Sequence, residues 1–140
     1  MELTLKQINN CKNALAILAN TRGLRSTVAY FIAKNIKEID KELETYNETR
    51  DKILKDKANK NDDGDPAILQ DEHGNSYYDL TDEKKKEFNE EIEAIENEKV
   101  EINIKKITLN DIENAGLSPL ELDSLEFMID TDEEEEQWKN

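Results

Sequence analysis

An apolar seam with heptad spacing runs through a long stretch of the chain that contains neither Gly nor Pro. Arg50 occupies the one position that interrupts the seam, whose members are Ile32, Ile36, Ile39, Leu43, Tyr46 and Ile53. Side chains at the a and d positions of a heptad share one face of a helix, where a second helix covers them. The seam therefore predicts one long helix, from about Ser26 to Asn59, with a helical partner.

A second, shorter seam supplies that partner. Phe88, Ile92 and Ile95 repeat the same spacing within residues 81–97, a segment that opens with the helix-start sequence Thr-Asp-Glu. Between the two seams lie a loop, residues 59–66, and a second segment of β-hairpin character. In that segment two apolar pairs flank a turn, in the order Ile68-Leu69, Asp71-Glu72-His73-Gly74-Asn75, Tyr77-Tyr78. The pattern predicts an antiparallel helical hairpin whose connection carries a short β-hairpin.

The two ends of the chain carry matching signals. Thr4 and Gln7 form a capping box that starts a helix at Leu5, and the sequence around Thr108 resembles it. We expect residues 1–3 to pair with a strand at residues 100–107. Ser118-Pro119 starts a final helix that is too apolar to remain undocked, because it contains Leu120, Leu122, Leu125, Phe127, Met128 and Ile129.

These elements predict a mainly α fold with a small β element, of the α+β class. It contains the long helix in an antiparallel helical hairpin, the short β-hairpin, and a body formed by the N- and C-terminal segments. We expect residues 1–130 to form a single helical domain from which the helical hairpin, about residues 26–97, projects. Residues 131–140 would form an acidic tail.

Charge is unevenly distributed along the chain, which has a net formal charge of −15. Residues 1–60 contain twelve Lys and Arg against eight Asp and Glu, whereas residues 109–140 contain eleven acids and one base. Charge of this kind steers association with an oppositely charged partner. The expected partner-binding residues are the acids at the C-terminal end and the lone tryptophan, an aromatic anchor beside them: Asp130, Asp132, Glu133, Glu134, Glu135, Glu136 and Trp138.

A basic patch lies around the start of the long helix and contains Arg22, Arg25, Lys34 and Lys37. Nucleic-acid binding is one interpretation, but a chain with this net charge is repelled from polyphosphates at long range. We favour the alternative that these cations meet the chain's own acidic C-terminal part.

Other classes of function find little support in the sequence. Residues 59–70 imitate a calcium-binding loop, but Asn59 and Gln70 stand where the chemistry requires carboxylates. The single His73 and single Cys11 lie in separate elements, so neither a metal site nor a nucleophile–base pair is expected. We expect no enzyme, cofactor or metal. The N-terminus lacks the features of a signal peptide and no apolar run has membrane-spanning length, so we expect a soluble protein.

Several segments follow one another in a distinctive order: MELTLKQI, KNIKEIDKELETYNETRDKIL, the variable turn DEHGN, VEINIKKITLNDIE, LSPLELDSLEFMI and the acidic end. Together they cover nearly the whole chain and resemble small acidic proteins of unknown function that tailed phages and prophages of Gram-positive bacteria encode. The resemblance implies a phage origin and a helical body with a small β element. It implies no activity and no residue roles.

Two functions of different classes follow as hypotheses. The first is a non-enzymatic phage accessory protein in the host bacterial cytoplasm. It would inhibit a basic, nucleic-acid-handling host protein, such as a defence nuclease or CRISPR effector, by occupying its nucleic-acid groove. It would not bind nucleic acid directly or associate with a membrane. The alternative is a virion-assembly or tail-associated protein that forms a homo-oligomer through the coiled-coil positions Ile39, Leu43 and Tyr46.

Overall fold

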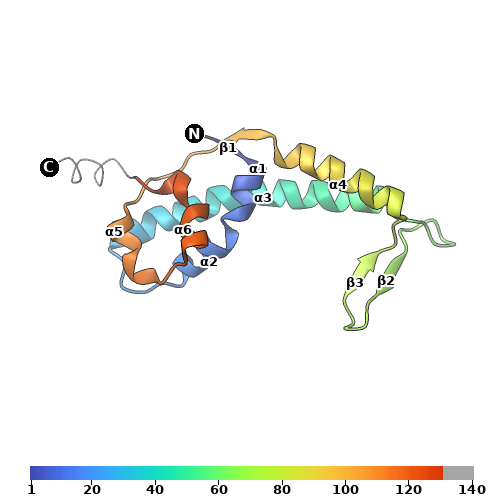
Figure 1. The fold of residues 1–140 in the computed structure, drawn as a ribbon, viewed down its shortest axis with the longest axis horizontal. Coiled ribbons are helices and arrows are strands. Elements are labelled where there is room, and N and C mark those ends of the chain that lie inside the picture. The colour runs from blue at the N-terminus through green and yellow to red at the C-terminus, as the bar shows by residue number, and fades with distance from the viewer. Residues whose placement is uncertain (131–140) are drawn as a thin grey trace. The chain divides into compact units, whose positions relative to one another are not determined.

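The computed structural model describes residues 1–130, which form two compact units (Figure 1). Within the described residues, unit 1 consists of Met1–Leu43 and residues 99–130, and unit 2 is Glu44–Glu98. The predicted long helix is present as α3 (Ser26–Lys57) and contributes residues to both units. The mainly α fold with small β elements is therefore confirmed.

Unit 1 contains the remaining terminal elements in the order of the sequence. They are β1 (Glu2–Thr4), α1 (Leu5–Asn10), α2 (Lys12–Ala19), β4 (Lys99–Glu101), α5 (Leu109–Ile112), the 3-10 turn η1 (Glu113–Ala115), α6 (Pro119–Ser124) and the 3-10 turn η2 (Glu126–Met128). Unit 2 contains β2 (Ile68–Gln70), β3 (Ser76–Tyr78) and α4 (Asp82–Glu96).

Capping boxes fix the starts of three short helices in unit 1. Thr4 with Gln7 caps α1, Thr108 with Asp111 caps α5, and Ser118 with Glu121 caps α6. In each, the hydroxyl accepts from a backbone N–H of the first turn while the longer side chain accepts from the N–H of the capping residue. Helices of this length are marginal alone, so the caps and the packing that surrounds them set their bounds.

Two strand contacts stabilise unit 1, and the first of them joins the N-terminal and C-terminal parts of the chain. β1 pairs with β4 in antiparallel register, with Leu3 opposite Val100. Farther along, Ile107 and Ile129 form a parallel bridge. The predicted pairing of residues 1–3 with the later strand is confirmed. The strand is shorter than expected, since only Lys99–Glu101 faces a partner strand.

The core of unit 1 is apolar apart from one amide. Its largest fully buried side chains are Ile8, Cys11, Leu18, Asn35, Ile39, Ile112, Leu125 and Met128. The final segment is docked as expected, with one difference: Leu120 is 83% exposed. It lies in the first turn of the six-residue helix α6, which has only enough length to bury one narrow face.

Asn35 connects α3 to the segment that follows β4. Its Nδ2 donates to the Lys105 carbonyl at 2.9 Å, and its Oδ1 accepts from the Lys105 N–H at 2.8 Å. The same Nδ2 lies 3.8 Å from the Met128 sulfur. A fully buried amide therefore uses both ends of its side chain to bind both backbone groups of one residue, Lys105, and holds that segment in register.

We expect the Cys11 thiol to be nearly unreactive in the folded chain. The thiol is completely buried and donates to the Ile8 carbonyl at 3.0 Å, and burial raises its pKa to about 11. Because only the thiolate reacts, modification by Ellman's reagent at pH 8 should be on the order of a hundredfold slower than in urea-unfolded chain. Equal rates in the two states would contradict this burial.

Candidate binding surface

Unit 2 holds nearly all of the net charge of the described residues. It contains eighteen Asp and Glu against eight Lys and Arg, a net formal charge of −10. The described part of unit 1 contains eleven acids and ten bases, a net charge of −1. The middle of the sequence, where residues 61–108 contain fifteen acids and six bases, is thus acidic like the C-terminal end, and most of it belongs to one folded unit.

The helical part of unit 2 is an antiparallel pair, formed by the end of α3 and α4. The Tyr46 hydroxyl donates to Glu96 at 2.7 Å, while at the other end of the pair Lys57 Nζ lies 3.5 Å from Glu87 and 3.2 Å from Glu91. Between them, the Arg50 guanidinium lies 5.3 Å from the centre of the Phe88 ring. These contacts confirm the predicted helical hairpin and fix its register.

Burial and the Glu96 carboxylate raise the pKa of Tyr46 to about 12. The phenol is therefore neutral at physiological pH and acts as a hydrogen-bond donor rather than as an acid or base. Its chemistry is that of a structural contact between α3 and α4.

The connection between α3 and α4 contains two turns of the same design. Asn61 Oδ1 accepts from the backbone N–H groups of Asp63 and Asp65, and Asp71 Oδ1 accepts from those of His73 and Asn75. In each turn a glycine with positive φ, Gly64 or Gly74, stands three residues after the accepting side chain. Asn-Asp-Asp-Gly-Asp and Asp-Glu-His-Gly-Asn are therefore two copies of one turn.

Hydrogen bonds at Asn59 attach the β-hairpin to the end of α3. The Asn59 N–H donates to the Asp79 carbonyl at 2.7 Å, and its own carbonyl accepts from the Ala67 N–H at 2.8 Å. The Asp79 N–H donates to the Ala67 carbonyl at 3.0 Å. Three chain segments thus meet at the base of the hairpin, and their hydrogen bonds fix the position of that base at the end of α3.

The β-hairpin leaves large apolar side chains in solvent. β2 and β3 pair Ile68 with Tyr78 and Leu69 with Tyr77. Ile68 is 61%, Tyr77 48% and Leu69 41% exposed. The two paired strands cover one another only along one edge, so side chains on the faces of the hairpin stay in solvent wherever no other element packs on them. Exposed apolar side chains within an acidic unit are typical of an interaction surface.

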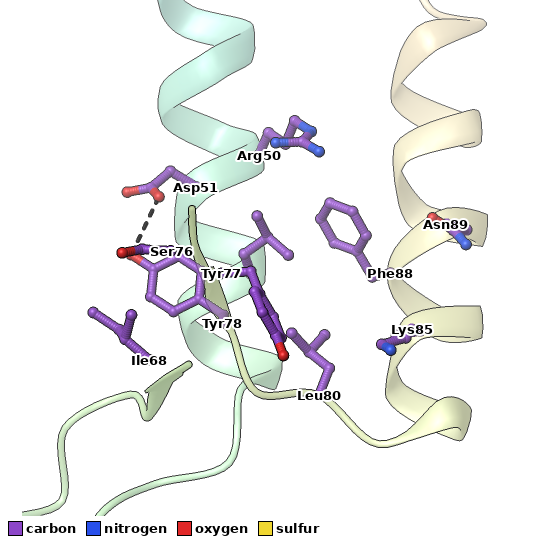
Figure 2. A pocket seen from close by; sticks show the side chains of 11 residues that line it. Arg50, Asp51, Ile68, Ser76, Tyr77, Tyr78, Leu80, Lys85, Phe88 and Asn89 are labelled. Atoms are coloured by element: carbon purple, nitrogen blue, oxygen red, sulfur yellow. Dashed lines mark hydrogen bonds between the residues drawn. The ribbon is translucent and has the colours of Figure 1, made fainter. Parts of the chain in front are cut away.

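Beside the hairpin lies a pocket of about 690 Å³ within unit 2 (Figure 2). All three residues of β3 line it, together with Ile68 of β2, and α3 and α4 provide the opposite walls. In Figure 2 the Tyr77 ring lies beside Leu80, while the Tyr78 hydroxyl is directed to Asp51, 3.5 Å away. The apolar part of the lining consists of Leu54, Ile68, Tyr77, Leu80 and Phe88.

The charged groups that line this pocket are two cations and one carboxylate. Arg50 and Lys85 provide two cations, and Asp51 is already engaged by Lys55 at 2.9 Å. Throughout residues 1–130, no three His, Cys, Asp or Glu side chains are grouped to hold a metal ion. The arrangement offers apolar area, aromatic rings and a surrounding charge, which are the ingredients of a protein-binding surface.

The residues predicted to bind a partner are only partly within the described region. Asp130 follows the Ile107–Ile129 bridge, is half-buried, and donates its N–H to the Ile107 carbonyl at 2.7 Å. The other members lie outside the described residues: Asp132, Glu133, Glu134, Glu135, Glu136 and Trp138. The acidic end therefore begins at a fixed position on unit 1.

The predicted oligomerisation seam is buried within the chain itself. Ile39, Leu43 and Tyr46 are 2%, 5% and 6% exposed, respectively. The first two lie in unit 1 and the third in unit 2. Self-association through this seam would first require the side chains that cover it to move away.

Part of the basic patch pairs with the acidic last third of the chain, as we favoured. Arg25 lies 2.7 Å from Asp111, whose side chain is 10% exposed. Burial opposes ionisation of Asp111, but hydrogen bonds from Thr108 and Arg25 outweigh it and lower its pKa. Lys34 lies 5.4 Å from the centre of the Tyr30 ring. These contacts give the two cations intramolecular roles.

The exposed apolar side chains of the hairpin and the adjacent pocket are functional candidates that sequence reasoning missed. The alternation of residues 68–78 predicts strands but contains no information on what covers them. A signal was present in the repeated Asx-x-x-Gly turns, which place both ends of the strands in acidic loops. Acidic loops on both sides of an apolar pair indicate that the pair is displayed rather than buried.

We expect the Asp71 side chain to stabilise the hairpin turn as a hydrogen-bond acceptor, a role that an asparagine side chain can also perform. Asp71→Ala should speed amide hydrogen exchange at His73 and Asn75, because both N–H groups lose their acceptor. Asp71→Asn should preserve protection, since Asn61 performs the same role in the other turn. An unchanged exchange rate in Asp71→Ala, measured by NMR, would show that the turn does not need this side chain.

The same turn should loosen in acid. Hydrogen bonds from the Asn75 and His73 N–H groups lower the pKa of Asp71 below its usual range. A carboxylate with a depressed folded-state pKa stabilises the folded form above its unfolded pKa, and that contribution disappears as pH falls through the folded value. Protection at Asn75 should therefore fall in acid for the native chain but change less for Asp71→Asn.

Comparison with known proteins provides no family assignment for this arrangement. In the described region no helix has the length and apolarity needed to cross a membrane. No family model, curated protein or solved structure matches the chain in our comparisons.

Proposed function

We propose that the protein is a non-enzymatic, acidic binding protein that inhibits a basic, nucleic-acid-handling partner. The observation that carries this proposal is the combination found in unit 2: a net charge of −10 and a hairpin with exposed Ile68, Leu69 and Tyr77. Charge steers the encounter with a basic protein, and exposed aromatic and aliphatic side chains supply the contact area.

A nucleic-acid groove is the kind of partner surface that fits such a protein. These grooves are lined with Lys and Arg that neutralise phosphates. A folded unit that displays acids on helices and loops can occupy the same cations, so inhibition would be competitive with nucleic acid. The resemblance to phage proteins makes a bacterial defence nuclease or CRISPR effector the natural class of target, met in the host cytoplasm.

The acidic end supplies a second contact in this proposal. Residues 131–140 contain five acids and Trp138. Asp130, where this segment starts, is held to Ile107 in unit 1. In this proposal the tail contributes long-range attraction and one aromatic anchor, and unit 2 contributes the structured surface.

The test is capture followed by competition. The full chain is immobilised, host proteins are bound at low salt, and the partner that elutes with salt is purified and its affinity measured. Affinity should fall steeply between about 0.05 M and 0.3 M salt, because screening shortens the range of charge interactions. Nucleic acid should displace the protein from the partner.

Two results would count against the proposal. One is an affinity that does not change with salt, and the other is a ternary complex in which partner, nucleic acid and protein coexist without competition. Deletion of residues 131–140 is the accompanying variant. It should weaken binding if the tail is a contact, and unchanged affinity would remove the tail from the proposal while leaving unit 2.

A further inference from the structure

In each strand of the β-hairpin, the register directs one set of backbone N–H and C=O groups away from the partner strand. Asp79 donates to Ala67 and Asp71 donates to Asn75, so the pairs 67/79 and 71/75 are hydrogen-bonded across the ladder. Hydrogen-bonded and non-hydrogen-bonded pairs alternate in an antiparallel ladder. The N–H and C=O groups of Ser76 and Tyr78 on β3, and of Ile68 and Gln70 on β2, therefore point outward.

These outward groups form strand edges that no further strand covers in the described part of the chain, where the sheet contains only β2 and β3. The two edges differ in their surroundings. Each residue of β3 lines the pocket, whereas β2 contributes only Ile68 to it (Figure 2). The β3 edge thus combines free backbone hydrogen-bonding groups with an adjacent apolar cavity.

The charge of the residues around the β3 edge indicates what kind of segment binds there. The connecting segment, residues 59–80, contains six Asp and Glu and one Lys. A second copy of this chain would bring the same acidic segment against itself, which is repulsive. An extended segment of a basic protein instead places its Lys and Arg beside these acids.

We propose that the β3 edge binds an extended, basic segment of the partner by strand addition. The proposal rests on the function proposed above and names the contact that would perform it. Backbone groups of the segment pair with Ser76 and Tyr78. Side chains of an extended strand alternate between its two faces, so one apolar residue enters the pocket against Leu54, Leu80 and Phe88.

The two cations that line the pocket determine which side chains of the bound basic segment can enter it. Arg50 and Lys85 line the pocket and disfavour a second cation there. Lys and Arg of the segment are therefore directed to the loops, where Asp62, Asp63 and Glu72 are exposed. The preferred ligand alternates basic and apolar residues.

The test uses a defined probe, a fluorescent eight-residue peptide that alternates Lys with Val. The full-length protein should bind it, and the peptide that carries Glu in place of Lys should not bind. A third peptide keeps every side chain but is N-methylated at alternate backbone amides along the edge that would pair. It should bind about tenfold more weakly or worse, the equivalent of one or two lost backbone hydrogen bonds.

Two proline substitutions provide a matched pair in the protein. Ser76→Pro removes an outward N–H from the β3 edge. Gln70 is the register partner of Ser76, and Gln70→Pro removes the corresponding outward N–H from the opposite, β2 edge. Ser76→Pro should weaken peptide binding about tenfold or more, whereas Gln70→Pro should change it less than about threefold. If both variants bind as the native chain does, or if Gln70→Pro is the more damaging, the assignment to β3 is wrong.

Further measurements keep the result interpretable. The circular dichroism spectrum and exchange protection of the Asp79 N–H, which donates to the Ala67 carbonyl across the hairpin, establish that each variant is folded. If Ser76→Pro does not fold, Tyr77→Ser replaces it, with an expected loss of binding from the pocket side. Sedimentation of the native chain should show no dimer. A dimer that Ser76→Pro dissociates would make a second copy of the chain the occupant of the edge and would overturn the proposal.

The outcomes also separate this inference from the function on which it rests. If the captured partner binds in a salt-dependent way but the Lys-Val peptide does not bind, strand addition is refuted and the binding function stands. If neither the partner nor the peptide binds, the function itself is refuted.

Discussion

Replacing Asn35 by Leu should destabilise the folded chain by about 3 kcal/mol, although the two side chains are similar in size. Asn35 is fully buried and its amide satisfies both the N–H and the C=O of Lys105, at 2.8 and 2.9 Å. Leu fills the space but leaves the N–H and the C=O of Lys105 without these partners. An unsatisfied buried group costs about 1–3 kcal/mol, and two are created here.

Urea unfolding measures this loss of stability as a lower midpoint concentration of urea, with the dependence of the unfolding free energy on urea unchanged. Asn47→Leu is the matched control, since Asn47 lies on the same helix in an exposed position and its replacement should change stability by less than about 0.5 kcal/mol. If Asn35→Leu cost no more than Asn47→Leu, the contact between α3 and the segment after β4 would not contribute to stability.

Replacing Ile39 by Ala should destabilise the monomer by about 3 kcal/mol. Ile39 is 2% exposed and lies at the centre of the apolar seam of α3, beside Leu15 of α2. Removal of its outer methyl groups leaves a cavity that the surrounding side chains fill only partly. The loss is intramolecular, because the neighbours of Ile39 belong to the same chain.

Concentration dependence distinguishes this account from the coiled-coil alternative. The unfolding midpoint of the native chain and of Ile39→Ala should not depend on protein concentration, and sedimentation should give the same mass for both. Asp40→Ala, at the next and exposed position, should leave stability nearly unchanged. A midpoint that rises with concentration and an oligomer that Ile39→Ala dissociates would instead support assembly through the seam.

Local signals explain why much of the fold is predictable from the sequence. The capping residues Thr4, Thr108 and Ser118 act within three residues of themselves, so their roles are visible in a short window. The seams of α3 and α4 are similarly local in their spacing, and their pairing follows because each apolar seam needs a second helix to cover it. The β1–β4 pair required the additional hint that the two ends of the chain resemble each other.

Long-range contacts and exposure explain what is not predictable. Asn35 looks like an ordinary polar position of a helix, and its partner Lys105 is 70 residues away. Leu120 looks like a core residue because its neighbours are apolar, yet the start of the short α6 leaves it in solvent. Exposure of Ile68 and Tyr77 depends on how little of the hairpin faces other elements cover, which no local pattern encodes.

The distribution of charge also changes when it is counted by folded unit. Along the sequence the acids increase toward the C-terminal end, which directs attention to Asp130–Glu136. Grouped by contacts, the segment between Glu44 and Glu98 carries −10 and the described part of unit 1 only −1. The surface proposed to meet a basic partner is therefore a structured one, held by the contacts between α3 and α4.

The most direct test of that claim compares two variants of equal charge. One neutralises three exposed acids of unit 2, Asp62→Asn, Asp63→Asn and Glu72→Gln, and the other neutralises three exposed acids of unit 1, Glu113→Gln, Asp123→Asn and Glu126→Gln. Calorimetry against the captured partner should show at least about tenfold weaker binding for the first and less than about threefold for the second. Equal losses in both variants, or no loss in the first, would contradict a binding surface located on unit 2.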